Sequence, residues 1–161
     1  MRHETAAAAP VVPFVAVGNG LFTIRVRTYF QDTDAGGVVY HARYLDFFER
    51  CRMEWLRHLG IECRTLASKD GVLFIVRSLE IEYAKPARLD DALVIGLRVE
   101  IVGGAQMVVR QQVSRDDEIL ATGRVHLACV AAEGLRPARM PLAVRERISA
   151  WLPTETLPER P

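Results

Sequence analysis

Two carboxylates, two glycines and a histidine lie within ten residues of one another in the first third of the chain. Asp32 and Asp34 come first, Gly36 and Gly37 follow, and His41 closes the group. A carboxylate beside the start of a helix can act as a general base or a nucleophile. The unpaired N–H groups and positive dipole end of that helix can polarise a carbonyl oxygen. The spacing therefore predicts a small acid/base site for a carbonyl compound.

The segments on either side of this group indicate how it is positioned. The apolar run 21–30 is typical of a strand. From 42 to 59 the apolar residues recur at steps of three and four, which predicts one amphipathic helix with Gly60 as its C-cap. Arg52 projects within the apolar stripe of this helix. We expect its charge to reach solvent along its stem or to pair with Glu49, three residues earlier.

The remainder of the chain is rich in strand signals. Gly103-Gly104 and Asp116-Asp117 predict hairpin turns, and a short final helix is expected from Pro141 to Trp151 with Pro141 at its first position. The predicted strands are Val72–Tyr83, Leu93–Val102, Gln106–Ser114 and Ile119–Ala131. The pattern indicates an α+β domain in which a strongly curved antiparallel sheet wraps around one long central helix.

The stretch from Asp32 to Tyr44 reads Asp-Thr-Asp-Ala-Gly-Gly-Val-Val-Tyr-His-Ala-Arg-Tyr. It closely resembles the signature of the hotdog-fold acyl-CoA thioesterases of the 4-hydroxybenzoyl-CoA thioesterase family, and within that family it is most similar to the Tol–Pal-associated branch. The resemblance implies a hotdog fold, hydrolysis of an acyl-CoA or acyl carrier protein thioester, and no cofactor. Shorter blocks extend it to about residue 152: Phe47–Arg50, Val76–Arg77, Glu82–Tyr83, Pro86–Asp91, Cys129–Val130 and Arg136–Pro137.

The resemblance also assigns roles to individual residues. Asp34 matches the catalytic carboxylate of the family, with general base and nucleophile both open; without the match it would read as an Asx-turn or helix-entry residue. His41 lies at the start of the predicted helix, where its backbone N–H can bind the developing oxyanion. The resemblance also places its side chain at the site; the alternative is a helix-start histidine that bonds locally. Asp32 is expected to accept hydrogen bonds from local N–H groups.

Three further residues are expected to contact substrate. Gly37 allows the chain to turn and approach a ligand closely, and Tyr40 flanks the site, whereas Tyr44 is expected in the core. Phe30 departs from the family pattern, because close relatives often carry tyrosine at this position. The sequence leaves two alternatives open: the hydroxyl is dispensable, or another group replaces it while Phe30 shapes an acyl pocket.

Composition excludes several other function classes. Lysine and arginine number 21 against 20 acids, a net charge of +1, so no electrostatic drive toward nucleic acid is present. His126 has no second histidine or cysteine at ligand spacing, and no metal is expected. The cysteines Cys51, Cys63 and Cys129 form no C-x-x-C pair, which favours a reducing compartment and hence the cytoplasm.

The chain is expected to hold one domain, residues 20–152, between flexible tails at 1–19 and 153–161. No apolar run reaches the ~18 residues of a membrane span. The resemblance implies a homodimer or homotetramer with the substrate cleft between two sheets, and it allows peripheral association with lipid-synthesis or envelope machinery. A hotdog enoyl-thioester hydratase or dehydratase, or a non-catalytic scaffold that binds acyl carrier protein, remain alternative functions.

Overall fold

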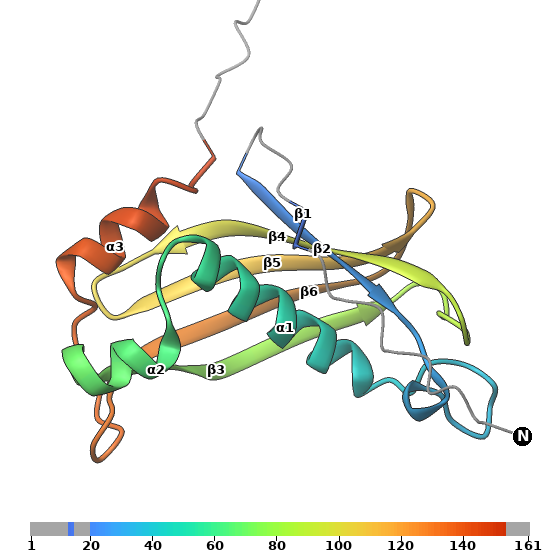
Figure 1. The fold of residues 1–161 in the computed structure, drawn as a ribbon, viewed down its shortest axis with the longest axis horizontal. Coiled ribbons are helices and arrows are strands. Elements are labelled where there is room, and N and C mark those ends of the chain that lie inside the picture. Colours follow the sequence, from blue (N-terminus) through green and yellow to red (C-terminus); the bar gives the residue numbers. More distant parts are fainter. Residues whose placement is uncertain (1–12, 15–19, 154–161) are drawn as a thin grey trace, which may run out of the picture.

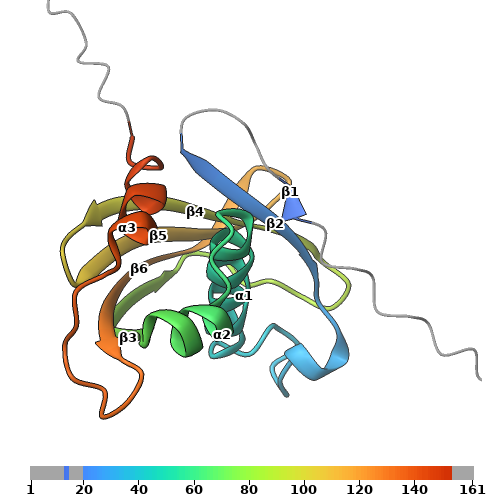
Figure 2. The same cartoon turned by 60° about the vertical axis from the view of Figure 1, so that its left-hand side comes forward.

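The computed structural model describes residues 13–14 and 20–153, and its frame is one antiparallel sheet in the order β1-β2-β4-β5-β6-β3. The strands are β1 Pro13–Phe14, β2 Leu21–Arg27, β3 Val72–Tyr83, β4 Ala92–Val102, β5 Gln106–Arg115 and β6 Glu118–Ala131. The sheet curves around the helix α1, Arg43–His58 (Figures 1 and 2). The predicted α+β architecture is therefore confirmed.

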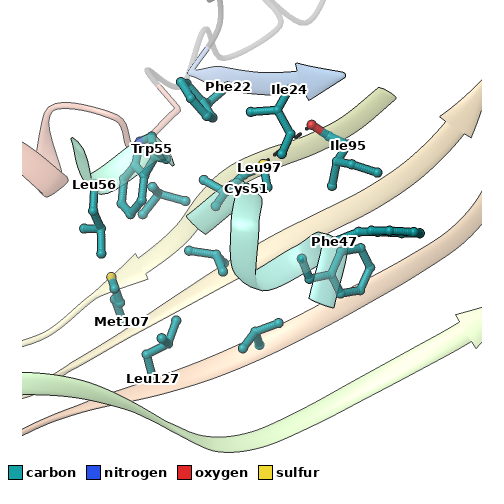
Figure 3. Close-up of a cluster of buried hydrophobic side chains, with 14 of the residues drawn as sticks. Phe22, Ile24, Phe47, Cys51, Trp55, Leu56, Ile95, Leu97, Met107 and Leu127 are labelled. Carbon is teal, nitrogen blue, oxygen red and sulfur yellow. Dashed lines mark hydrogen bonds between the residues drawn. The ribbon is translucent and has the colours of Figure 1, made fainter. Parts of the chain in front are cut away.

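Alternation along the strands explains why α1 lies on one face of the sheet. In β4, Leu93, Ile95, Leu97 and Val99 are buried, while the residues between them point to the opposite face. The apolar stripe of α1 packs against this buried face, where Cys51 donates a long hydrogen bond from Sγ to the Ile95 carbonyl oxygen at 3.5 Å (Figure 3). The core members labelled in Figure 3 are Phe22, Ile24, Phe47, Cys51, Trp55, Leu56, Ile95, Leu97, Met107 and Leu127.

The ends of α1 agree with the sequence to within a residue. Leu59 is the C-cap, and Gly60 follows it with φ +70°, the left-handed conformation that glycine adopts without strain. The last helix of the described residues, α3, spans Leu142–Ser149, with Pro141 at the N-cap rather than at the predicted first helical position. β2 also ends earlier than expected, because Phe30–Asp32 form a 3₁₀ turn.

The expected pairing of Arg52 with Glu49 is wrong as a hydrogen bond. Arg52 Nη1 donates to Gln111 Oε1 at 2.8 Å, and the Gln111 side chain in turn donates from Nε2 to the Phe48 carbonyl oxygen at 3.0 Å. Burial lowers the pKa of Arg52, and Glu49 opposes this only through its charge. The buried side-chain amide of Gln111 thus accepts a hydrogen bond from the guanidinium of Arg52, which α1 places over the sheet.

The segment between α1 and β3 was not assigned from the sequence. It contains α2, Cys63–Thr65, and a π-helical turn, Leu66–Asp70, which ends at Gly71. Most of the two predicted tails, 1–19 and 153–161, lies outside the described residues. The described part of the N-terminal tail, Pro13–Phe14, pairs with β2 as strand β1. Among the described helices, none is long and apolar enough to cross a membrane.

We predict that Gly123→Ala lowers the thermal midpoint of unfolding by several degrees. A Cβ at Gly123 would lie 2.5 Å from Cε2 of Phe48 and 3.3 Å from the Glu80 carbonyl oxygen. Phe48 is fully buried and cannot move aside. Overpacking of this kind costs about 1–3 kcal/mol. Calorimetry on Gly123→Ala and on Gly104→Ala, where a Cβ meets nothing within 4 Å, tests this; equal midpoints would contradict it.

Candidate active site

The segment between β2 and α1 folds into a short hairpin beyond the N-terminal end of the helix, at the lower right in Figure 1. Its backbone contacts join three residue pairs: Asp32 with Tyr40, Thr33 with Val39, and Asp34 with Val38. Gly37 closes the turn with φ +72°, and its N–H donates to the Asp34 carbonyl oxygen at 3.0 Å. A residue with a side chain would be strained there, so Gly37 supports the hairpin that carries Asp34.

Asp34 lies exposed near the tip of this hairpin. Its Oδ1 accepts a hydrogen bond of 2.8 Å from the Gly36 N–H, which is the Asx-turn geometry. Among the hydrogen bonds of the described residues, none reaches Oδ2 of Asp34. One oxygen therefore fixes the orientation of the carboxylate, while the other is free to take a proton or to attack a carbon atom.

Asp32 has a different environment, although it lies only two residues away. The side chain is buried, with 4% of its surface exposed. Its Oδ2 accepts the Tyr29 N–H at 2.8 Å, and Oδ1 lies 3.7 Å from Nε of Arg43. This confirms the prediction that Asp32 is a local hydrogen-bond acceptor, because both oxygens are occupied by groups of the hairpin and the helix.

His41 stands at the entrance to α1. The peptide unit between Tyr40 and His41 is held by the Arg43 N–H, which donates to the Tyr40 carbonyl oxygen at 2.8 Å. Because a trans peptide directs its C=O and N–H in opposite directions, the His41 N–H points away from the helix. No acceptor for that N–H is recorded within the described residues. An oxygen atom of a ligand can therefore bind there, at the positive end of the helix dipole.

The hairpin brings Asp34 and His41 to the same end of α1 without joining them. His41 follows Val38, the partner of Asp34, by three residues, and no hydrogen bond between the two is recorded within the described residues. A small carbonyl group can be bound between a carboxylate and an N–H arranged in this way. The geometry supports the chemistry expected from the sequence.

The aromatic residues around the site divide into buried and exposed ones. Tyr44 is 2% exposed and belongs to the core, as predicted. Tyr40 is exposed, and its ring lies 4.5 Å from that of His41 between centroids. Phe30 is 81% exposed in the single chain. A role for Phe30 in lining an acyl pocket therefore requires another surface to cover it.

The loop that follows β3 fixes the hairpin from the other side. Ala87 accepts the Val39 N–H at 2.8 Å and donates its own N–H to the Tyr44 hydroxyl at 3.0 Å. The hydroxyl of Tyr83, the last residue of β3, donates to the His41 carbonyl oxygen at 2.8 Å. Sequence reasoning gave these residues no role at the site. The only signal was that the Glu82–Tyr83 and Pro86–Asp91 blocks belong to the family resemblance.

Other chemically active side chains in the described residues do not form a second site. Burial raises the pKa of the Cys51 thiol to about 12, which excludes an activated thiolate. His126 Nε2 lies 3.3 Å from Nη1 of Arg124, to which it is hydrogen-bonded. Within the described residues, no group of three His, Cys, Asp or Glu side chains could hold a metal ion.

A hollow of about 320 Å³ runs along the outward side of α1. It is lined by Asp46, Glu49, Arg50, Met53 and Glu54. Neither Asp34 nor His41 borders it. Its acidic lining also makes it unsuited to the phosphates of coenzyme A. This hollow is therefore not the site that the hairpin forms.

Comparison with known proteins supports the assignment that this geometry suggests. The model of the thioesterase-like superfamily matches residues 28–152. The chain belongs to this superfamily. The acyl-CoA thioesterase YbgC of Haemophilus influenzae is 43% identical over 124 residues, which cover 77% of this chain and 91% of that relative.

Similar solved structures agree with this family assignment. A probable thioesterase from Bartonella henselae has 40% identity and a TM-score of 0.72, covering 75% of this chain and 99% of the other. A mutant 4-hydroxybenzoyl-CoA thioesterase bound to 4-hydroxybenzoyl-CoA has a TM-score of 0.75 over 80% of this chain and 98% of the other. At 19% identity, the latter likeness shows the fold alone. The predicted family and hotdog fold are thereby confirmed.

Proposed function

We propose that this chain is an acyl-CoA thioesterase, which hydrolyses the thioester bond of an acyl-CoA to a free acid and a thiol. The observation that carries the proposal is the Asp34 carboxylate, exposed and held through one oxygen, at the same end of α1 as the free N–H of His41. The identity to the Haemophilus influenzae enzyme over most of both chains supports the same reaction. Acyl carrier protein is an alternative carrier of the thioester.

The proposed reaction uses Asp34 in one of two ways. As a general base, it takes a proton from water while the oxygen of that water attacks the thioester carbon, and the tetrahedral intermediate then breaks its C–S bond and releases the thiolate. As a nucleophile, it forms a mixed anhydride and releases the thiolate, and water then hydrolyses the anhydride. In both cases negative charge develops on the carbonyl oxygen, where the His41 N–H donates to it. A donor of this kind contributes about 3–4 kcal/mol to the barrier reduction.

An assay of thiol release tests the proposal. The purified full chain is incubated with acyl-CoA substrates of short, long and aromatic acyl groups, and free coenzyme A is measured over time. We expect turnover well above the uncatalysed rate for at least one group. The same acyl groups on acyl carrier protein form the second arm. If no substrate in either arm were hydrolysed, the thioesterase assignment would be wrong.

We further propose that two copies of the chain join along β3 into a homodimer. This strand lies at the edge of the sheet, and its only partner in the described residues is β6. Its residues on the helix-facing side are partnered by buried residues of β6, yet α1 does not fully cover them, and Val76 is 48% exposed. The residues on this side are Phe74, Val76, Leu79, Ile81 and Tyr83.

An apolar, half-covered edge strand favours pairing with a second copy. Pairing along β3 would bring the partner's surface close to the end of β3 that contacts His41 and so cover the exposed site. This arrangement also offers a cover for Phe30. A homotetramer would add a second interface to this one.

The proposed compartment is the cytoplasm, which the three free thiols support. We also propose that the protein associates peripherally with lipid-synthesis or envelope machinery.

Phe30→Tyr is expected to leave kcat within about threefold of the unsubstituted enzyme, a change of ~0.6 kcal/mol in the barrier. The side chain is mostly exposed in the single chain, so the added hydroxyl meets no packing obstacle. Steady-state kinetics on the best acyl-CoA checks this. A tenfold gain would show that the phenol is needed and that phenylalanine impairs the natural site.

A further inference from the structure

The hydroxyl of Tyr83 contacts the site, although it takes no part in the bond changes of the proposed reaction. Tyr83 ends β3, and its Oη donates to the His41 carbonyl oxygen at 2.8 Å. These residues are far apart in the sequence, so the bond joins the edge of the sheet to the entrance of α1.

The bond replaces one that a regular helix would supply. In an α-helix the N–H of Leu45 would donate to the oxygen of His41, four residues earlier. Here the Leu45 N–H donates to the Ala42 carbonyl oxygen at 3.1 Å instead. The Tyr83 hydroxyl therefore satisfies a carbonyl oxygen that the first turn of α1 leaves without its usual donor.

Both peptide planes next to His41 are thereby held. The plane before it is fixed through the bond from the Arg43 N–H to the Tyr40 oxygen, and the plane after it through the bond from Tyr83. Because each peptide unit is planar, these bonds leave little rotation about the two backbone torsions of His41. The direction of the His41 N–H therefore depends on both hydrogen bonds.

The tyrosine ring is itself held in place. It lies edge-on to the ring of Tyr44, with centroids 5.2 Å apart and planes at 83°. Tyr44 is anchored by the Ala87 N–H, which donates to its hydroxyl. Partial burial, and to a lesser degree the neighbouring Tyr44, raise the pKa of Tyr83, so its hydroxyl keeps the proton that it donates.

We propose that Tyr83 is a positioning residue for the reaction: by holding the His41 carbonyl oxygen, it directs the His41 N–H toward the oxygen of the substrate as negative charge develops there. This inference rests on the proposed thioesterase function. Tyr83 does not contact the reacting atoms. Tyr83 acts on the hydrogen bond from the His41 N–H to the substrate oxygen, which strengthens in the transition state. Loss of the Tyr83 hydroxyl therefore changes kcat more than KM.

Tyr83→Phe tests this inference, because it keeps the ring and removes only the hydroxyl. We expect kcat to fall about tenfold with KM within about twofold, and the thermal midpoint to change little, since Tyr83 is 45% exposed. Tyr44→Phe is the matched control. It leaves the buried Ala87 N–H without its acceptor, so it should lower the midpoint more and kcat less.

A double substitution separates the backbone from the imidazole. If Tyr83 acts on the His41 N–H, Tyr83→Phe should lower kcat by a similar factor in a His41→Ala background; loss of the effect there would overturn the inference. An active enzyme with unchanged kcat in Tyr83→Phe would also overturn it. Failure of the thioesterase proposal is a different result, because the unsubstituted enzyme would then show no turnover at all.

Discussion

Asp34→Asn is expected to lower kcat by at least about a hundredfold while leaving the fold intact, the loss expected when a general base or nucleophile is removed. Asparagine keeps an Oδ1 that can accept the Gly36 N–H, which Asp34 accepts at 2.8 Å, so the turn survives. It can neither take a proton nor attack the thioester carbon. The variant therefore removes the chemistry and retains the local structure.

The matched control is Asp32→Asn, the other acid of the hairpin. Asp32 is buried against Arg43 and the Tyr29 N–H, so its replacement should reduce stability more and kcat less than Asp34→Asn does. Circular dichroism, thermal unfolding and thiol-release kinetics on both variants give the comparison. A folded Asp34→Asn enzyme with near-normal turnover would remove Asp34 from catalysis and the assignment of the site with it.

Local signals account for the parts of the fold that the sequence predicted well. The period of the apolar residues placed α1 and the strands β3, β4, β5 and β6 within one residue, because α1 and the sheet bury one face each, whereas β2 ends three residues earlier than predicted. Asp116 and Asp117 mark a hairpin and both adopt positive φ, as such turns require. The candidate site was also predicted from one short segment, since Asp34 and His41 both lie on it, and the family resemblance selected Asp34 as the catalytic carboxylate.

Contacts between distant segments account for what was missed. Arg52 was matched to a neighbour on its own helix, but its hydrogen-bond partner is Gln111 on β5. Tyr83 reaches His41 only because the sheet brings the end of β3 to the start of α1. No repeat of apolar residues marks the turn at Leu66–Asp70, because its conformation is set by the path that the chain takes between α1 and β3. Tertiary packing decides such features, and local sequence patterns do not record it.

Val76→Glu is expected to make the protein monomeric at micromolar concentration and to lower its activity by at least about a hundredfold. Val76 is half exposed in the single chain, so a glutamate there costs the monomer little. In the proposed dimer the carboxylate would be buried at the β3 edge, and twofold symmetry would bury it twice. An unpaired buried charge costs several kcal/mol, and each 1.4 kcal/mol weakens association tenfold.

Ser78→Glu provides the control on the same strand. Ser78 is exposed and pairs with His126, so it lies on the face of β3 opposite to Val76, and the new charge would lie beside the His126 and Arg124 side chains. This variant should remain dimeric and active. Light scattering should give at least twice 18.0 kDa for the unsubstituted protein and for Ser78→Glu, and about 18.0 kDa for Val76→Glu. A monomeric Val76→Glu protein with full activity would show that one chain forms the complete site, and a dimeric one would show that the copies join elsewhere.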